Sequence, residues 1–73
     1  MPTFMVWARI VAKREHATNY YITFADATGE PREFEVNSHD YAQFAGGDTG
    51  RLSYDQFKRY VGFEPGETAF HLR

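Results

Sequence analysis

The sequence predicts a small all-β fold, an antiparallel roll or barrel of five strands, OB-like or SH3-like, with one short helical turn around residues 39–45. Aromatic and aliphatic residues alternate with other residues through residues 20–24 and again through residues 32–36. Because successive side chains of a strand point to opposite faces, both segments turn an apolar row toward one core. In addition, glycine, proline, asparagine and aspartate separate most of the short apolar segments at the spacing of tight turns.

The length of 73 residues fits a single domain, which we expect to be one small β-barrel with a tail from about residue 65. A domain of this size buries only roughly 60% of the surface that its unfolded chain exposes, so it needs large apolar side chains. Seven Phe, five Tyr and one Trp supply them. The absence of cysteine excludes disulfides and thiolate zinc sites.

The charge and hydropathy of the chain argue against two kinds of partner, nucleic acid bound by bulk charge and the interior of a lipid bilayer. The formal net charge is −2, with acids and bases mixed along the chain, which argues against binding to nucleic acid mainly by bulk positive charge. No apolar run approaches the roughly 20 residues that span a bilayer. We therefore expect the chain as given to be soluble, in a compartment that the sequence leaves open.

The first strand is predicted over residues 2–14. One of its faces is wholly apolar and the other is mixed, as expected for a sheet with a single buried side. Its β-branched and aromatic residues favour a strand over a helix. The residues expected to face the core are Phe4, Val6, Ala8, Ile10 and Ala12.

The second and third strands are predicted to form a β-hairpin through a turn over residues 26–31, where Gly29 supplies the positive φ of a tight return. A short helix should follow. Ser38 is its expected N-cap, and Tyr41 and Phe44 lie three residues apart, so that they share the face toward the sheet. Two consecutive glycines then end the helix.

Two further strands are predicted before and after a turn over residues 55–57. In the second of them, Val61 and Phe63 are expected to point inward and Tyr60 outward. The apolar residues at 70 and 72 in the tail leave a sixth, edge strand open as an alternative to a frayed end.

The order and spacing of five motifs resemble a bacterial family, the YhhM-like proteins, catalogued as a domain of unknown function. The match covers roughly residues 8–63, most of the chain, although each motif alone is a generic strand-and-turn pattern. The motifs are ARIVAKR (8–14), YYITF (20–24), EFEV (33–36), Tyr41 with GDTGRLSY (47–54), and RYVGF (59–63).

The resemblance implies a small β-domain that usually follows an N-terminal membrane helix, and it implies no catalytic activity and no functional residues to carry over. The sequence departs from the family pattern in two respects. It contains no membrane segment, so either the chain was trimmed before Met1 or this member is soluble. Residues 55–58 replace a shorter Gln-Gly turn, which leaves the register of the last hairpin open.

Candidate catalytic and metal-binding groups have simpler interpretations. His16, His39 and His71 show no short-range ligand spacing, so we expect surface histidines, no metal and no cofactor. Glu33 and Glu35 share the outward face of a strand, where solvation or pairing with Arg9, Arg32 or Arg51 is expected rather than acid–base catalysis. The glycine-rich segment 46–50 follows a helix instead of opening one, which indicates a turn and not a phosphate site.

The outer face of the first two strands is the predicted interaction surface, formed by Trp7, Arg9, Val11 and Tyr21, with Lys13 beside them. Exposed apolar side chains rimmed by charge often mark a partner site. The sequence therefore predicts a non-enzymatic module that associates with another protein or with itself. The alternative is an OB-like domain that stacks single-stranded nucleic acid on these aromatic residues.

Overall fold

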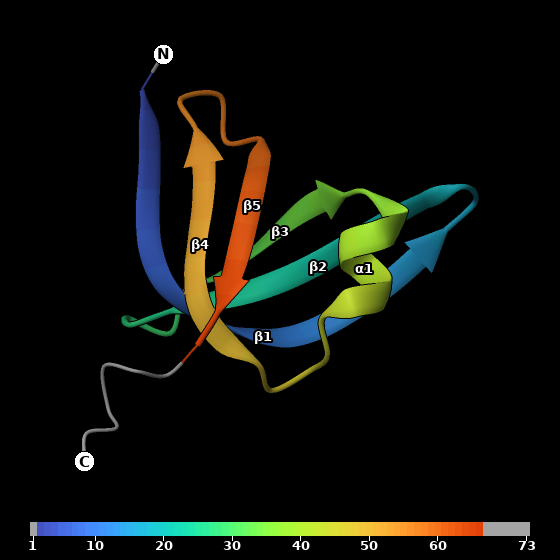
Figure 1. Ribbon diagram of the computed structural model, residues 1–73, viewed down its shortest axis with the longest axis horizontal. Coiled ribbons are helices and arrows are strands. Elements are labelled where there is room, and N and C mark those ends of the chain that lie inside the picture. The colour runs from blue at the N-terminus through green and yellow to red at the C-terminus, as the bar shows by residue number, and fades with distance from the viewer. Residues whose placement is uncertain (1, 67–73) are drawn as a thin grey trace.

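The computed structural model describes residues 2–66, which form one five-stranded antiparallel sheet and one short helix (Figure 1). The strand order is β3-β2-β1-β4-β5, without hydrogen-bonded pairing between the two outer strands, so the all-β prediction is confirmed as an open roll and not a closed barrel. The elements are β1 (Thr3–His16), β2 (Asn19–Asp26), β3 (Pro31–Val36), α1 (Ser38–Gln43), β4 (Thr49–Asp55) and β5 (Tyr60–Pro65).

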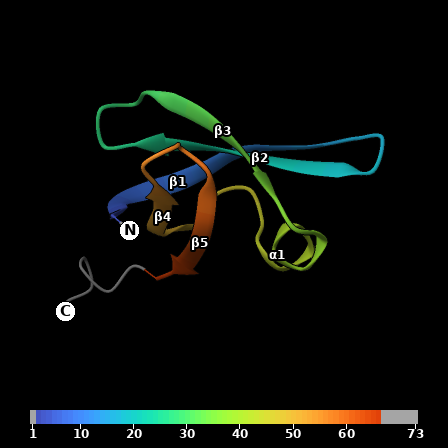
Figure 2. The same cartoon turned by 90° about the horizontal axis from the view of Figure 1, so that it is seen from above.

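The long strand β1 organises the sheet because it belongs to both of its halves. Its N-terminal part pairs with β4 from Thr3 to Arg9, and its C-terminal part pairs with β2 from Ala8 to His16. The strand curves between the two parts, so that β4 and β5 stand against β2 and β3 (Figure 1). Figure 2 shows the two halves as two layers, with α1 at one end.

A β-bulge at Val11 changes which side chains of β1 face inward. Ile10 pairs with Phe24, but the next registered pair is Ala12 with Thr23, so one extra residue is inserted. A bulge shifts the alternation of the strand by one residue. The prediction for Ala12 is therefore wrong, because Ala12 is exposed and the following residue, Lys13, takes the inward position.

The core lies between the layers and contains the apolar row of the β2–β3 hairpin, as predicted. Ile22 and Phe34 are register partners, and both are almost completely buried. The Phe24 ring packs against Phe34 and, across the layers, against Phe63 with ring centroids 5.1 Å apart. The buried core comprises Ala8, Ile10, Ile22, Phe24, Phe34, Val36, Phe44, Leu52 and Phe63.

The helix α1 covers one end of the roll. Its N-cap is Asn37 rather than the predicted Ser38, because the Asn37 side chain accepts the hydrogen bond from the Asp40 amide at 2.7 Å. Tyr41 on α1 and Phe44 at its C-cap both pack against the core as predicted, although the helix ends at Gln43, before Phe44. Lys13 ties the end of the helix to β1, since its Nζ donates to the Phe44 carbonyl at 2.6 Å.

The last hairpin contains a second bulge, which corrects two predictions. Tyr54 pairs with Tyr60 while Ser53 pairs with Gly62, so Val61 is the inserted residue and is 56% exposed. Tyr60 instead turns toward the core, where its ring stacks with Phe24. Phe63 is buried as predicted. The suggested sixth strand at residues 70–72 lies outside the described residues.

Candidate functional site

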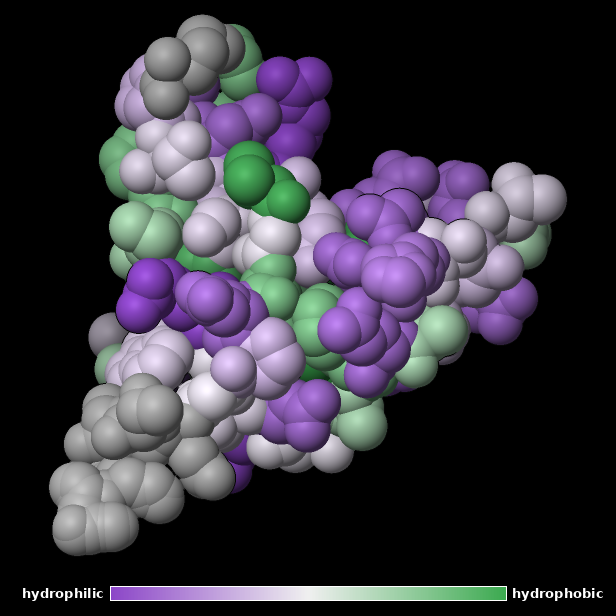
Figure 3. Space-filling view, viewed as in Figure 1, coloured by the Kyte–Doolittle hydropathy of each residue, from purple (hydrophilic) through white to green (hydrophobic). Residues whose placement is uncertain are grey.

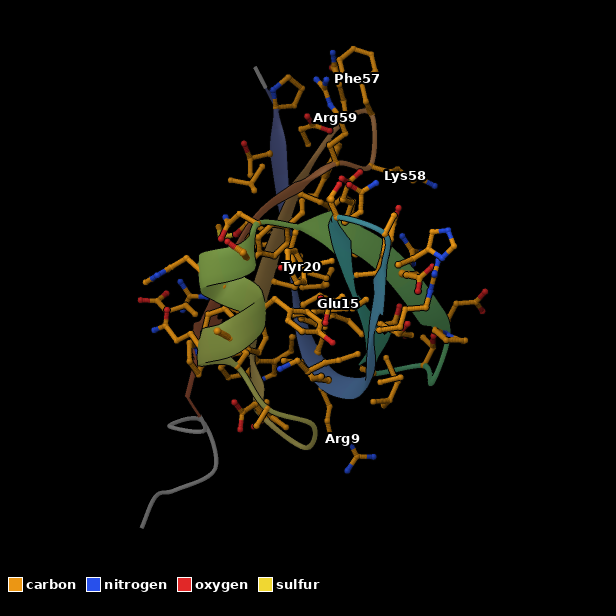
Figure 4. All side chains as sticks on the ribbon, turned by 90° about the vertical axis from the view of Figure 1, so that its right-hand side faces the viewer. Arg9, Glu15, Tyr20, Phe57, Lys58 and Arg59 are labelled. Carbon is orange, nitrogen blue, oxygen red and sulfur yellow. The ribbon has the colours of Figure 1, made fainter. Side chains whose placement is uncertain are left out.

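Trp7 and Arg9 lie on the outer face of β1, where this strand passes from β4 to β2. Trp7 is the register partner of Arg51 on β4, and Arg9 is paired with both Thr49 and Ala25. The Trp7 side chain is 37% exposed. Figure 4 shows Arg9 extending away from the body of the domain.

An open, largely apolar groove of about 450 Å³ runs beside these two side chains. Trp7 and Arg9 line it from β1, and Ala25, Ala27 and Gly29 line it from the end of β2 and the β2–β3 turn. We call Trp7, Arg9 and this groove the Trp7 surface. Met5, which is 59% exposed, continues its apolar part along β1.

The β2–β3 turn forms a firm wall for the groove because Asp26 holds it together. Asp26 Oδ1 accepts hydrogen bonds from the Thr28 hydroxyl at 2.6 Å, from the Thr28 amide at 2.9 Å and from the Glu30 amide at 3.2 Å. Gly29 has φ +84°, as the sequence predicted. The Thr28 hydroxyl is the main reason why the pKa of Asp26 lies below its ordinary value.

The β4–β5 turn is held by a carboxylate in the same way as the β2–β3 turn. The Asp55 carboxylate accepts hydrogen bonds from the amides of Phe57 and Arg59 and from Arg59 Nε. Its pKa is lowered, first by the Arg59 amide. Lys58 completes the turn with φ 63°, although it is not a glycine.

These two carboxylates predict a specific acid sensitivity. Because their pKa values are lower in the folded chain than in the unfolded one, the native state binds fewer protons, and their contribution to stability is lost as the pH falls below about 4. We expect the chemical denaturation midpoint of D26N/D55N to change less between pH 5 and pH 2.5 than that of the wild type. An equal change in both proteins would contradict this role of the turns.

Arg9 has no ion-pair or hydrogen-bond partner within residues 2–66. The neighbouring Arg51 makes only a long, exposed contact of 3.8 Å with Glu64. Exposed pairs of this kind contribute little stability. A partner could therefore bind the guanidinium of Arg9 on the Trp7 surface, and that of Arg51 beside it, without breaking a strong contact within residues 2–66.

The bulge separates the other two predicted surface residues from Trp7. Val11 is 47% exposed at the bulge itself. Tyr21 lies farther along, opposite Arg14, and the Arg14 guanidinium covers its ring at 4.3 Å while binding Glu33 at 2.7 and 3.1 Å. The predicted four-residue row is thus not continuous, because Trp7 and Arg9 lie together and half-buried Tyr21 belongs to a separate cluster.

Two details of the sequence prediction are corrected by these contacts. Lys13 is not on the outer face, since it lies 4.3 Å from the Tyr41 ring centre on the inner side. Glu33 pairs with Arg14 and not with any of the three predicted arginines. Sequence analysis missed the part played by the β2–β3 turn in the groove, for which only the Asp26-x-Thr28 pattern of a side-chain-bonded turn gave a local signal.

The remaining candidate groups form no cluster with evident chemistry. His16 and His39 are exposed, and His71 lies outside the described residues. Within residues 2–66, no three histidine or carboxylate side chains gather closely enough to hold a metal ion. Residues 46–48 form the turn that leads into β4, and the Gly47 amide and Asp48 carbonyl bond to Ile10, next to the β1 bulge.

One tyrosine has a strongly altered environment, but its role is structural. The Tyr60 hydroxyl donates a 2.7 Å hydrogen bond to Asp40 Oδ2 and so ties β5 to α1. Burial, followed by this hydrogen bond, raises the pKa of Tyr60 far above its ordinary value. A neutral phenol held in this way acts as a fixed donor and not as an acid or base near neutral pH.

The fold and the exposed Trp7 surface define a small, open, all-β domain. A family model described as a protein of unknown function, DUF2500, matches residues 2–64, so the chain belongs to this family. Among residues 2–66, no helix has the length and hydrophobicity to cross a bilayer.

Two solved structures have the same fold. The chain is similar to a DUF2500 crystal structure from Klebsiella pneumoniae, with 26% identity, 88% of this chain and 98% of that chain covered, and a TM-score of 0.78. It is also similar to a crystal structure from Proteus penneri, with 24% identity, 89% and 93% covered, and a TM-score of 0.81. No curated protein matches the sequence.

Proposed function

We propose that this domain is a non-enzymatic association module that binds another protein, or a second copy of itself, through the Trp7 surface. The observation that carries the proposal is a partly exposed indole beside a guanidinium that has no hydrogen-bond or ion-pair partner within residues 2–66, both at the rim of an apolar groove. Tryptophan, methionine and arginine are enriched where proteins bind each other, because they bury large areas and still make directional contacts.

The rigidity of the surface supports the same function. Trp7 and Arg9 are held on a strand that is paired on both sides at Arg9, and the facing turn is fixed by Asp26. A preformed surface loses little conformational entropy on binding, so more of its contact energy appears as affinity. The proposal includes the YhhM-like assignment of this family member, supported by the order and spacing of its motifs between residues 8 and 63.

A charge inserted at the centre of the surface should abolish association. We expect Trp7→Glu to abolish the complex with a protein partner, or the dimer of the isolated domain, measured by sedimentation velocity. The matched control is Phe57→Glu, because Phe57 is 60% exposed on the β4–β5 turn, far from Arg9 (Figure 4). Equal association of Trp7→Glu and wild type would show that this surface is not the interface.

Binding of single-stranded nucleic acid is the competing outcome of that experiment. Bases could stack on Trp7 next to Arg9 and Arg51, but the net charge of −2 opposes a polyanion. A titration with labelled oligonucleotides at low and moderate salt separates the two functions. Salt-sensitive binding that Trp7→Glu removes would replace protein association by the OB-like alternative.

A further inference from the structure

The edge of β3 faces a second groove, away from the Trp7 surface. This groove has a volume of about 460 Å³ and is bounded on one side by the consecutive residues 33–37 and on the other by residues 58–60. If one face of β3 lined the groove, only every second residue of the strand would contribute to the lining. Consecutive residues line it, which shows that the open edge of β3 borders the groove. Figure 3 shows the hollow between the upright part of the domain and the part that carries α1.

The main-chain groups on this edge have no hydrogen-bond partner among the described residues. The Asp26 amide donates to the Glu30 carbonyl, which makes these two residues a hydrogen-bonded pair of the hairpin. Such pairs recur at every second residue of an antiparallel ladder, so Phe34 and its even-numbered neighbours bond to β2. The amides and carbonyls of Glu33 and Glu35 therefore point to the free edge, where a further strand would bond to them.

The other open edge of the sheet is a poorer template. β5 carries the bulge at Val61 and ends at Pro65, which has no amide hydrogen. Bulges and prolines are features that prevent pairing at sheet edges. β3 pairs with β2 without a register shift, and its only proline is its first residue, Pro31.

The side chains of β3 select what can pair with it. Glu33 and Glu35 point outward from the strand, while Phe34 and Val36 are buried on the inner side. Directly opposed residues of neighbouring strands share a face, and like charges there are destabilising. A second copy of β3 would place glutamate next to glutamate, so the edge disfavours self-pairing, whereas a strand with basic outward and apolar inward residues complements it.

The opposite wall of the groove carries two cationic side chains, Lys58 and Arg59. The Arg59 guanidinium is held by Asp55 at 3.0 Å, and Lys58 projects from the turn away from Arg59 (Figure 4). On the β3 side, Glu33 is bound to Arg14, while Glu35 has no ion pair among the described residues. Glu35 is thus the carboxylate that is left for a basic partner.

We propose that the β3 edge binds an extended segment of a partner protein, in which basic and apolar residues alternate, as an added sixth strand. Main-chain hydrogen bonds to Glu33 and Glu35 supply the pairing, and the alternating side chains supply the selectivity. This site is separate from the Trp7 surface, so the two sites can be tested independently.

The test uses three capped, fluorescently labelled peptides and the complete chain. In the first peptide lysine and valine alternate, in the second the same residues are grouped in two blocks, and in the third glutamate replaces lysine. We expect the anisotropy titration to show binding of the alternating basic peptide at least about tenfold tighter than either of the others. Binding should also protect the Glu33 and Glu35 amides from hydrogen exchange.

Charge variants locate the binding site. We expect Glu35→Lys to weaken binding of the basic peptide by about tenfold or more. The substitution replaces an attractive pair of glutamate and peptide lysine by two repelling lysines. Glu15→Lys is the control with the same change in net charge, because Glu15 is exposed on β1, which β2 separates from β3. The control and Trp7→Glu should both bind like the wild type.

Two results would overturn the proposal. Equal affinity for the alternating and the block peptide would mean that the peptides bind through their charge alone and do not pair with β3 as an added strand. Binding that Trp7→Glu removes while Glu35→Lys leaves it intact would assign the peptide to the Trp7 surface instead.

Discussion

Replacing Phe24 by alanine is expected to cost about 3–5 kcal/mol of unfolding free energy, the range found for buried phenylalanines. Phe24 is 1% exposed, and its ring contacts Phe34, Tyr60 and Phe63, so it joins both layers of the roll. A domain of this size has roughly 4–11 kcal/mol of stability in total. Urea denaturation followed by circular dichroism should show a large loss of stability or a chain already unfolded in buffer.

Phe57→Ala is the control for this variant. Phe57 is 60% exposed and its ring contacts the Arg59 guanidinium at 5.0 Å. The same truncation there should change the unfolding free energy by less than about 0.5 kcal/mol. Similar losses in both variants would show that the two-layer core is wrongly assigned.

Gly50→Ala is expected to have the second large effect, a loss of about 1–3 kcal/mol or more, although it adds a single methyl group. Gly50 is buried on β4, and a Cβ there would clash with the Glu64 carbonyl oxygen and lie 2.6 Å from Pro65 Cα. Both atoms belong to the backbone of β5 and cannot turn away as a side chain can. Overpacking therefore has to push β5 off the sheet.

Gly62→Ala tests whether the effect is specific. Gly62 lies on the neighbouring strand, and apart from its chain neighbours no heavy atom of residues 2–66 lies within 4 Å of a Cβ placed there. Thermal melts should show Gly62→Ala close to wild type and Gly50→Ala strongly destabilised. A Gly50→Ala protein that melts at the wild-type temperature would rule out the close approach of β4 and β5.

The hairpin and the core could be predicted because the alternation over residues 20–36 is regular and is bounded by a recognisable turn. The two bulges could not be predicted, because Val11 and Val61 are ordinary strand residues. Each insertion depends on contacts with residues that are distant in the sequence. At Val11 the neighbouring Ile10 bonds to the loop at residues 46–48, which no local pattern indicates. The errors for Ala12, Lys13, Tyr60 and Val61 all follow from these two insertions.

The orientation of the candidate surface residues could be predicted only where no bulge intervenes. Trp7 and Arg9 precede the first bulge, so their outward positions follow from simple alternation. Tyr21 was correctly placed on the outer face, but the Arg14 contact that covers it depends on the β1–β2 register. The open sheet also depends on tertiary geometry, because strand lengths and turns alone do not decide whether β3 meets β5.

The most direct test of the association function uses Trp7 as its own probe, because it is the single tryptophan in the chain. Its emission and its quenching by acrylamide should be measured for the free domain and for the dimer or partner complex isolated by sedimentation, with a tryptophan-free partner segment. Burial of the Trp7 surface predicts a blue-shifted emission and a clearly lower quenching constant in the complex. A complex in which Trp7 is quenched as readily as in the free domain would contradict the proposed interface.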